Sequence, residues 1–365
     1  MSQSRMEKYH DKNNKPVKNR STKGKPRKSK KPKKRSKASK IILTSLLLVF
    51  LFILGVSFFY IFNILNGIKG QKISDNHDDL GINKELVQQL QESGKNKNIT
   101  NIALFGTDER DSSEKGRSDA VMVLTIDTEH GKLKLSSLMR DSYVDIDGHG
   151  KDKLNHAYAF GGPQLAIKTI NKNFNLNITD YATVNFYHLQ DIIDVIGGIE
   201  IDVKKEEIEE VNKMMNELAF LGKYKPPFIK SPGLQTLNGK QALAYTRTRN
   251  IGNGDFDRAA RQRTVLNALF NKVTSAGVTK YPAIINSVLP MVETSLSKAE
   301  ILKIGTDVLT SGLKDLEQER FPVDGYFKDG GQTINGVWYL VYDIKQTSKQ
   351  MYDYIFNDIK PQPKK

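Results

Sequence analysis

The sequence predicts an α/β domain with a largely buried sheet, preceded by one transmembrane helix. Near the N-terminus, residues 41–68 are mostly apolar and carry no charge. Beyond residue 99, short apolar runs bounded by turn residues alternate with segments whose apolar residues recur at helical spacing. Such alternation is typical of folds in which helices cover a central sheet.

The positive charge of the chain is confined to its N-terminal tail. The chain has 365 residues, a net charge of +15, 56 Lys and Arg, and 41 Asp and Glu. Residues 1–40 hold 17 of the basic and two of the acidic residues, which leaves 39 of each for the rest. Their polar composition predicts disorder. Because the remainder is neutral, charge gives no reason to expect a nucleic-acid partner.

The uncharged stretch is long enough to cross the cell membrane. About 20 apolar residues span a bilayer core, whereas the apolar part of a signal peptide is only about 7–15 residues long. We therefore predict an uncleaved helix at residues 41–66, with the basic tail in the cytoplasm and the following chain outside. An extracellular connector at 67–98, a domain at 99–358 and a C-terminal tail at 359–365 would follow.

Three apolar runs rich in β-branched residues predict the first strands of the domain. Their ranges are 100–106, 120–126 and 132–138. Residues 144–147, followed by two glycines, predict a hairpin. A helix begins at residue 153, stops at Gly161 and Gly162, and restarts at Pro163, because proline fits the first turn of a helix.

The alternation then continues until a charged segment interrupts it. We expect a strand at 181–185, a helix at 187–195 and a strand at 199–203. The charged segment 204–222 has helical spacing and would form a lid or an edge. Later helices are expected at 281–289, 297–313 and 343–358, and strands at 320–323 and 336–341. The second of these helices starts with Ser297 and Glu300 at the spacing of a capping box.

An arginine-rich stretch at residues 244–263 is the strongest functional candidate. Asn238 would cap a short helix that leads into a strand at 245–249. In that strand Arg247 and Arg249 would lie on one face, because strand side chains alternate.

A second helix would begin at Asp255 and run to about residue 273, with one apolar face. Stepping back along that face reaches Gln262 and Arg258. Guanidinium groups and helix N-terminal amides bind phosphate groups well. The alternative is that these arginines are solvated, or paired with Asp255 and Asp257.

Two acids stand at the ends of neighbouring predicted strands. Asp108 follows one strand and Asp119 precedes the next, so an antiparallel pair would bring both to one sheet edge. Close carboxylates favour a cation between them, and Mg²⁺ (or Mn²⁺) with phosphate oxygens suits such a pair. Alternatively, Asp108 caps a turn and Asp119 pairs with Arg117.

Further arginines gather near these acids. Arg117 and Arg140 lie at loop ends, and the others are Arg247, Arg249, Arg258 and Arg261. This density beside metal ligands suggests a pyrophosphate ligand. His156 could act as a base, although a lone histidine is more often structural.

Several chemistries are excluded or unsupported. The chain has no cysteine, so it has neither disulfides, Cys-ligated zinc nor a catalytic thiol. Motifs of P-loop, HExxH zinc, dinucleotide-binding and GxSxG serine sites do not occur.

The order of motifs resembles the LytR-CpsA-Psr family of cell-wall enzymes. The matching pieces lie between about residues 99 and 273 and include NIALFGTDER, GRSDAVMVLTID, LSSLMRDSYVDI, KLNHAYAFGG and LNGKQALAYTRTRN with DFDRAARQR. The resemblance implies a three-layer α/β/α sandwich with a mixed central sheet and a long apolar pocket for a polyprenyl chain.

The resemblance also implies an activity. Members are thought to move an anionic glycopolymer, such as teichoic acid or capsular polysaccharide, from a polyprenyl-pyrophosphate carrier to the muramic acid C6 hydroxyl of peptidoglycan. Asp108 and Asp119 would hold Mg²⁺. The residues that would bind pyrophosphate are Arg117, Arg140, Arg247, Arg249, Arg258 and Gln262. Arg117, Arg140, Asp119 and Arg249 would be catalytic. The general base is not identified; Asp119 and Asp257 are candidates.

Two other functions use the same residues. An extracellular regulatory protein could bind polyprenyl phosphate or a polyanion without turnover. A pyrophosphate hydrolase would make the same cut with water and leave no polymer on the wall. The long acidic segment 204–222 departs from the family pattern and leaves the acceptor side open.

Overall fold

The computed structural model describes residues 70–108, 116–277, 280–310, 312–313, 315–328 and 331–364. The predicted cytoplasmic tail and transmembrane helix lie outside these ranges. Within them, no helix is both long and apolar enough to cross a membrane.

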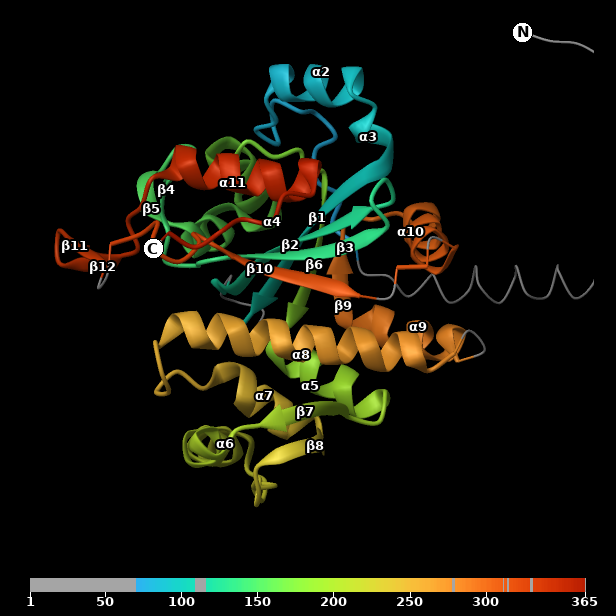
Figure 1. Cartoon of the computed structure of the whole chain (residues 1–365). Coiled ribbons are helices and arrows are strands. Elements are labelled where there is room, and N and C mark those ends of the chain that lie inside the picture. Colours follow the sequence, from blue (N-terminus) through green and yellow to red (C-terminus); the bar gives the residue numbers. More distant parts are fainter. Residues whose placement is uncertain are drawn as a thin grey trace, which may run out of the picture. The chain divides into compact units, whose positions relative to one another are not determined.

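A six-stranded mixed sheet forms the centre of the fold, with the order β10-β3-β2-β1-β6-β9 (Figure 1). Its strands are β1 (Ile99–Thr107), β2 (Ser118–Asp127), β3 (Lys132–Leu138), β6 (Asp180–Asn185), β9 (Val292–Thr294) and β10 (Leu316–Phe321). β6 runs parallel to β1 and β10 parallel to β3, and the remaining pairs are antiparallel. The expected mixed sheet is confirmed. The strands predicted at 100–106, 120–126, 132–138 and 181–185 are its strands β1, β2, β3 and β6.

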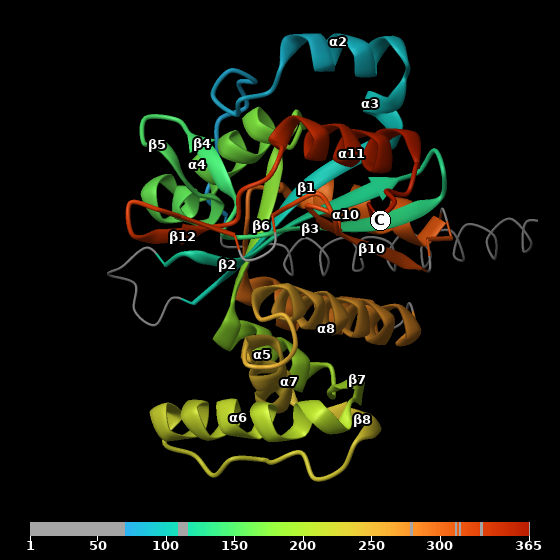
Figure 2. The same ribbon diagram turned by 60° about the vertical axis from the view of Figure 1, so that its left-hand side comes forward.

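Helices cover both faces of this sheet, as Figures 1 and 2 show. One face carries α2 (Lys84–Glu92), α4 (Leu154–Phe174) and α11 (Ile344–Asn357), with α3 (Lys95–Asn98) leading into β1. The other carries α5 (Phe186–Val195), α8 (Asp255–Ser275), α9 (Tyr281–Val288) and α10 (Lys298–Thr310), with η2 (Leu289–Met291) after α9. Successive residues of β1 serve the two layers in turn, because strand side chains alternate. Ala103 and Phe105 pack in the α4–α11 core, and Ile102 and Leu104 pack toward α8 and α10.

The first layer contains two features that the sequence predicts. β4 (Tyr143–Ile146) and β5 (Gly150–Lys153) form the expected hairpin. α4 is interrupted where the glycines stand, since Gly162 has a φ of 66° and a ψ of −158°. Residues before Ile99 also join this layer: Leu80, Leu86 and Leu90 are buried in the same core as Ala103.

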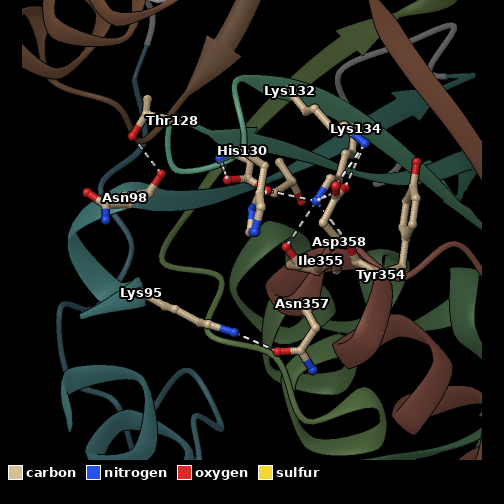
Figure 3. Close-up of polar contacts among 12 residues, drawn as sticks. Lys95, Asn98, Thr128, His130, Lys132, Lys134, Tyr354, Ile355, Asn357 and Asp358 are labelled. Carbon is tan, nitrogen blue, oxygen red and sulfur yellow. Dashed lines mark hydrogen bonds and ion pairs between the residues drawn. The ribbon is translucent and has the colours of Figure 1, made fainter. Parts of the chain in front are cut away.

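The C-terminal helix is held by charged and polar contacts at the ends of β2 and β3 (Figure 3). Lys134 is fully buried, and its Nζ lies 2.7 Å from Asp127 Oδ2 and 3.0 Å from the carbonyl oxygen of Tyr354 at the end of α11. Before α11 the chain forms a short hairpin of β11 (Gln332–Ile334) and β12 (Val337–Tyr339).

A second hydrophobic cluster lies beyond α8. β7 (Ile199–Val203) pairs with β8 (Gly233–Leu237), and both pack with η1 (Lys205–Glu207), α6 (Ile208–Gly222) and α7 (Gly239–Arg247). The predicted helix at 204–222 is therefore present, and its buried face, which includes Val211 and Met215, belongs to this cluster. In Figures 1 and 2, α6 lies on the side of α7 that is away from the central sheet.

The strand predicted at residues 245–249 is wrong. α7 continues through Arg247, and Thr248 is its C-cap. Asn238 caps the helix as expected, in a capping box with Gln241. The alternating threonines suggested a strand, but the Thr246 hydroxyl donates a 2.7 Å hydrogen bond to the Leu243 carbonyl inside the helix. The capping box and the buried face of α7 outweigh the weak strand propensity of threonine.

Candidate active site

The two predicted acids meet at one edge of the central sheet. Thr107 at the end of β1 pairs with Ser118 at the start of β2. Asp108 follows Thr107, and Asp119 lies inside β2 at the register shift between the Gly106–Ala120 and Thr107–Ser118 pairs. Both carboxylates are therefore at the same end of the β1–β2 pair, as predicted. Both line one polar cavity of about 350 Å³, which we call the arginine cavity. Its lining residues are Asp108, Arg117, Asp119, Arg140, Asp141, Lys153, Asn155 and Arg249.

Asp108 forms a bidentate salt bridge with Arg247. The two guanidinium nitrogens lie 2.7 Å from the two carboxylate oxygens. Burial lowers the pKa of Arg247, but the hydrogen bonds and charge of Asp108 more than offset this, so its pKa is raised. The end of α7 thereby fixes a guanidinium at the sheet edge, although the helix, not a strand, presents it.

Asp119 is paired with Arg140, and Arg249 Nη2 lies 3.7 Å from its second oxygen. The alternative pairing with Arg117 is not what the structure shows, since Arg117 lies exposed on the wall of the same cavity. Arg249 follows α7 in a loop and is half-exposed. Arg117, Arg140 and Arg249 are therefore all within reach of one ligand in this cavity.

Arg140 is the centre of this network. Beyond Asp119, its Nε lies 3.2 Å from Asp141 and its Nη2 lies 3.3 Å from Asp255. Burial lowers its pKa, but the charges of Asp119, Asp141 and Asp255 raise it by more. The guanidinium is thus held rigidly and fully charged.

Arg258 and Gln262 lie one turn apart near the N-terminal end of α8. Both are buried, with exposed fractions of 4% and 6%. Arg258 Nη2 lies 3.2 Å from Asp255, while burial and the charge of Arg140 lower the pKa of Arg258 to about 10. Arg258 Nε and Gln262 Nε2 have no hydrogen-bond partner in the part of the chain that is described. Buried donors without acceptors are costly, so an acceptor-rich ligand would stabilise this site.

Gln262 also lines an apolar cavity of about 280 Å³, which we call the apolar cavity. It lies between the sheet and α5, α8 and α9, and its walls include Leu104, Met122, Leu266 and Leu269. Gln262 and Thr246 are the polar residues of its lining. This is the kind of apolar pocket that the family resemblance implies.

Arg261 does not join the arginines of the sheet edge, contrary to the prediction. Its Nη2 donates a 2.7 Å hydrogen bond to the Thr248 carbonyl, and its Nη1 lies 3.7 Å from Glu207. α8 packs against both the sheet and the β7–α7 cluster. Arg258 and Arg261 of this helix therefore contact different parts of the fold. Asp255 is also not the N-cap: Gly254 is, and Asp255 stands in the first turn.

The proposed metal ligands meet the needs of a cation only in part. In the described ranges no group of three or more His, Asp or Glu is placed to hold a metal ion. Asp108 and Asp119 are two carboxylates on one wall, and the buried Asn155 Oδ1 beside them lacks a partner there. This oxygen set suits Mg²⁺ or Mn²⁺ if phosphate oxygens and water complete the shell.

The alternative pairing of an arginine with Asp255 is present, since Arg258 contacts it. The sequence does not predict Asp141, Lys153 or Asn155 as site residues, although Lys153 and Asn155 lie in the same short segment as His156. His156 Nδ1 instead lies 2.7 Å from Asp152. The available signal was the start of α4, whose first residues reach the cavity. The candidate base Asp257 accepts a hydrogen bond from the Asn253 backbone N–H and is not among the lining residues.

Comparison with known proteins identifies a family that matches most of the chain. The LytR_cpsA_psr family matches residues 63–354. A protein of Oceanobacillus iheyensis named polyisoprenyl-teichoic acid–peptidoglycan teichoic acid transferase TagU is 32% identical over 316 residues, which cover 84% of this chain and 90% of that protein. The TagU of Enterococcus faecalis is 35% identical over 251 residues, covering 67% and 77%.

Solved structures agree with this match. TagT bound to LI-WTA is 28% identical, with a TM-score of 0.55, over 72% of this chain and 91% of that one. TagT with bound octaprenyl pyrophosphate lipid is 26% identical, with a TM-score of 0.52, over 71% and 91%.

Proposed function

This chain belongs to the LytR-CpsA-Psr family, and on that premise we propose that it is a transferase of anionic glycopolymers. The donor would be a teichoic acid or capsular-type polymer on a polyprenyl-pyrophosphate carrier, and the acceptor would be the muramic acid C6 hydroxyl of peptidoglycan. The observation that carries the proposal is that the arginine cavity and the apolar cavity are lined by neighbouring residues of β2, Asp119 and Ala120. A polyprenyl pyrophosphate has the same two-part chemistry.

α8 carries residues suited to both parts of this ligand. Leu266 and Leu269 line the apolar cavity, Gln262 stands at its polar edge, and Arg258 lies one turn earlier. A turn of helix advances the chain by about 5.4 Å, which is close to the step from a prenyl carbon chain to its first phosphate. The prenyl chain would lie against the sheet, with its phosphates among Arg140, Arg249 and Arg258.

The arginines would act on the charge that develops during transfer. The acceptor hydroxyl oxygen forms a bond to the phosphorus that carries the polymer. The bridging P–O bond breaks, and polyprenyl monophosphate leaves with the electron pair. The hydroxyl proton passes to a carboxylate of the cavity and from there to water. Fixed guanidinium groups stabilise the phosphoryl oxygens without a covalent intermediate.

We also propose that Asp108 and Asp119 hold Mg²⁺ or Mn²⁺ when the donor is bound. Phosphate oxygens offer Arg140 and Arg247 new partners, which would leave the two carboxylates available as ligands. The cation would supply further charge neutralisation at the pyrophosphate. The oxygen set described above, including Asn155 Oδ1, supports this assignment.

Location at the outer face of the cell membrane fits the same proposal. The uncharged stretch at 41–66 would anchor the chain, and the basic tail would keep the N-terminus in the cytoplasm. Anchoring the enzyme in the membrane that holds the carrier raises its effective concentration at the donor.

The proposal is tested with the purified full chain, lipid-linked polymer and peptidoglycan. Arg249→Ala should lower transfer by roughly 100-fold or more, as loss of a transition-state donor does. Arg249 is half-exposed, so the fold should be retained. Lys230→Ala removes one exposed charge from the loop before β8 and serves as the control.

Two results would contradict the transferase. Release of polyprenyl phosphate at the same rate without peptidoglycan would indicate a hydrolase. Tight retention of lipid-linked polymer without any release would indicate a regulatory binding protein. Full transfer by Arg249→Ala would remove the arginine cavity from the mechanism.

A further inference from the structure

A third cavity opens at the N-terminal end of α8, beside the arginine cavity. It measures about 340 Å³, and we call it the aromatic pocket. Its main lining residues are Asn253, Asp255, Phe256, Phe327, Gly331 and Trp338. We propose that it binds a sugar ring of the acceptor glycan and positions the attacking hydroxyl. This inference rests on the proposed transfer to peptidoglycan and adds to it the place where the acceptor binds.

The aromatic rings of this pocket are held in fixed positions. Phe256 and Phe327 are stacked, with ring centroids 4.9 Å apart and an interplanar angle of 20°. The guanidinium of Arg320 lies 4.6 Å from the centroid of the Phe256 ring. Trp338 is 38% exposed, yet the backbone of Gly331 packs on its indole so closely that a Cβ there would lie 2.5 Å from the ring.

This chemistry suits a pyranose ring. A sugar presents C–H groups on its faces and hydroxyls around its edge, so it binds aromatic faces bordered by polar groups. The aromatic pocket offers such faces, with Asp255 and Asn253 as polar groups at its wall. An exposed indole that is already fixed loses little conformational freedom on binding.

The place of the pocket favours the acceptor over the donor. Along α8, Leu266 lines the apolar cavity, Arg258 reaches the phosphate-binding arginines, and Asp255 lines the aromatic pocket. Asp255 and Leu266 are therefore about 16 Å apart along the helix, on either side of the phosphates. In-line displacement puts the attacking oxygen opposite the leaving group. The leaving polyprenyl phosphate would lie toward the apolar cavity, so the acceptor comes from the aromatic pocket.

Asp255 connects the two sites. Its carboxylate lies 3.3 Å from Arg140 and 3.2 Å from Arg258, and it also lines the aromatic pocket. Burial raises its pKa, but the charges of Arg258 and Arg140 lower it by more, so the group stays ionised near neutral pH. A carboxylate in this place accepts a hydrogen bond from the acceptor hydroxyl and directs its oxygen toward the phosphorus.

The pocket contains its own spectroscopic probe, because Trp338 is the only tryptophan of the chain. Soluble glycan fragments of peptidoglycan should change its fluorescence in a saturable manner, with or without turnover. Phe327→Ala should raise the half-saturating concentration by roughly tenfold, the effect of losing one good stacking contact. Val337→Ala is the control. Val337 is 41% exposed and is the neighbour of Trp338 on β12, so its side chain points to the opposite face.

Kinetics with Trp338→Ala provide the second readout. The KM for peptidoglycan should rise by roughly tenfold, while the half-saturating concentration of lipid-linked polymer should not change. A glycan-induced fluorescence change in a chain without transfer activity would support the subsite and contradict the proposed function. Unchanged fluorescence together with an unchanged KM in Trp338→Ala would overturn the subsite alone. A response to lipid-free donor polymer, but not to peptidoglycan fragments, would overturn the acceptor assignment.

Discussion

Two buried arginines, one helical turn apart on α8, illustrate how burial and partners separate function from stability. Arg258 faces Asp255 and other arginines, and its pKa is lowered to about 10 by burial and by Arg140. Arg261 is equally buried but has the Thr248 carbonyl and Glu207 as partners. Arg258 is therefore close to other positive charges, whereas Arg261 connects α8 to the end of α7.

The pair yields a prediction with an internal control. Arg258→Met should weaken binding of lipid-linked polymer by roughly tenfold or more while leaving the thermal midpoint unchanged or higher, because it removes a poorly compensated buried charge. Arg261→Met should lower the free energy of unfolding by about 3 kcal/mol, since Glu207 loses its buried partner. Donor affinity should survive in the folded fraction of Arg261→Met. Calorimetry and a binding titration measure both, and a reversed pattern would contradict the assignment.

At this scale the sequence predicts positions better than directions. The proximity of Asp108 and Asp119 could be predicted, because both stand at the same end of two consecutive antiparallel strands. The different surroundings of Arg258 and Arg261 could not, because they depend on which elements flank α8. The same limit hid Asn155, whose side chain reaches the arginine cavity only after α4 is placed.

Among the elements, α11 depends on one buried lysine. Lys134 Nζ contacts Asp127, the carbonyl oxygen of Tyr354 and, at 3.1 Å, Asp358 (Figure 3). A cation at a helix C-terminus interacts favourably with the last carbonyls. Lys132 on the same strand also contacts Asp358, but it is 34% exposed.

Replacing these two lysines should have unequal effects. Lys134→Met should lower the free energy of unfolding by about 3–5 kcal/mol, because Asp127 keeps a buried charge with only His130 as a side-chain partner in the described contacts. Lys132→Met should cost about 1 kcal/mol or less, as exposed pairs do. Urea unfolding measures both. Equal losses would show that Lys134 is no more important than a surface ion pair.

Element types could largely be predicted, whereas their partners could not. The interruption of α4 at Gly161 and Gly162 follows from the residues alone. The strand at 199–203 was also predicted, but it pairs with β8 outside the central sheet. For residues 245–249, the period-2 alternation of Thr and Arg competed with the capping box at Asn238, and tertiary burial of α7 decided for helix.

Residues of α8 change in character along the helix: Leu266 and Leu269 line the apolar cavity, Arg258 is a buried cation, and Asp255 and Phe256 line the aromatic pocket. A lipid-linked polymer and its acceptor present the same series of chemistries: prenyl chain, pyrophosphate and sugar. The neutral charge of residues 41–365 makes the local excess of arginine a property of the site and not of the surface as a whole. Transfer by such a molecule would require the donor and the acceptor to be bound at the same time.

Attachment to the membrane is the remaining property of the whole chain, and its segment lies outside the described residues. If residues 41–66 cross the bilayer, arginines at Leu48 and Ile53 should oppose insertion by about 2.5–3.5 kcal/mol each. The double variant Leu48→Arg/Ile53→Arg should therefore lose most of its flotation with lipid vesicles. Leu48→Phe/Ile53→Phe should float like the parent chain, because both substitutions keep the stretch apolar.

The same variants separate anchoring from chemistry. The double arginine variant should transfer polymer poorly from a donor embedded in vesicles, since its effective concentration at the membrane is lost. It should remain as active as the parent on a donor with a short, water-soluble prenyl chain, because the arginine cavity is unchanged. Undiminished flotation of the arginine variant would show that residues 41–66 are not the anchor. Loss of activity on both donors would show that the substitutions damage the domain itself.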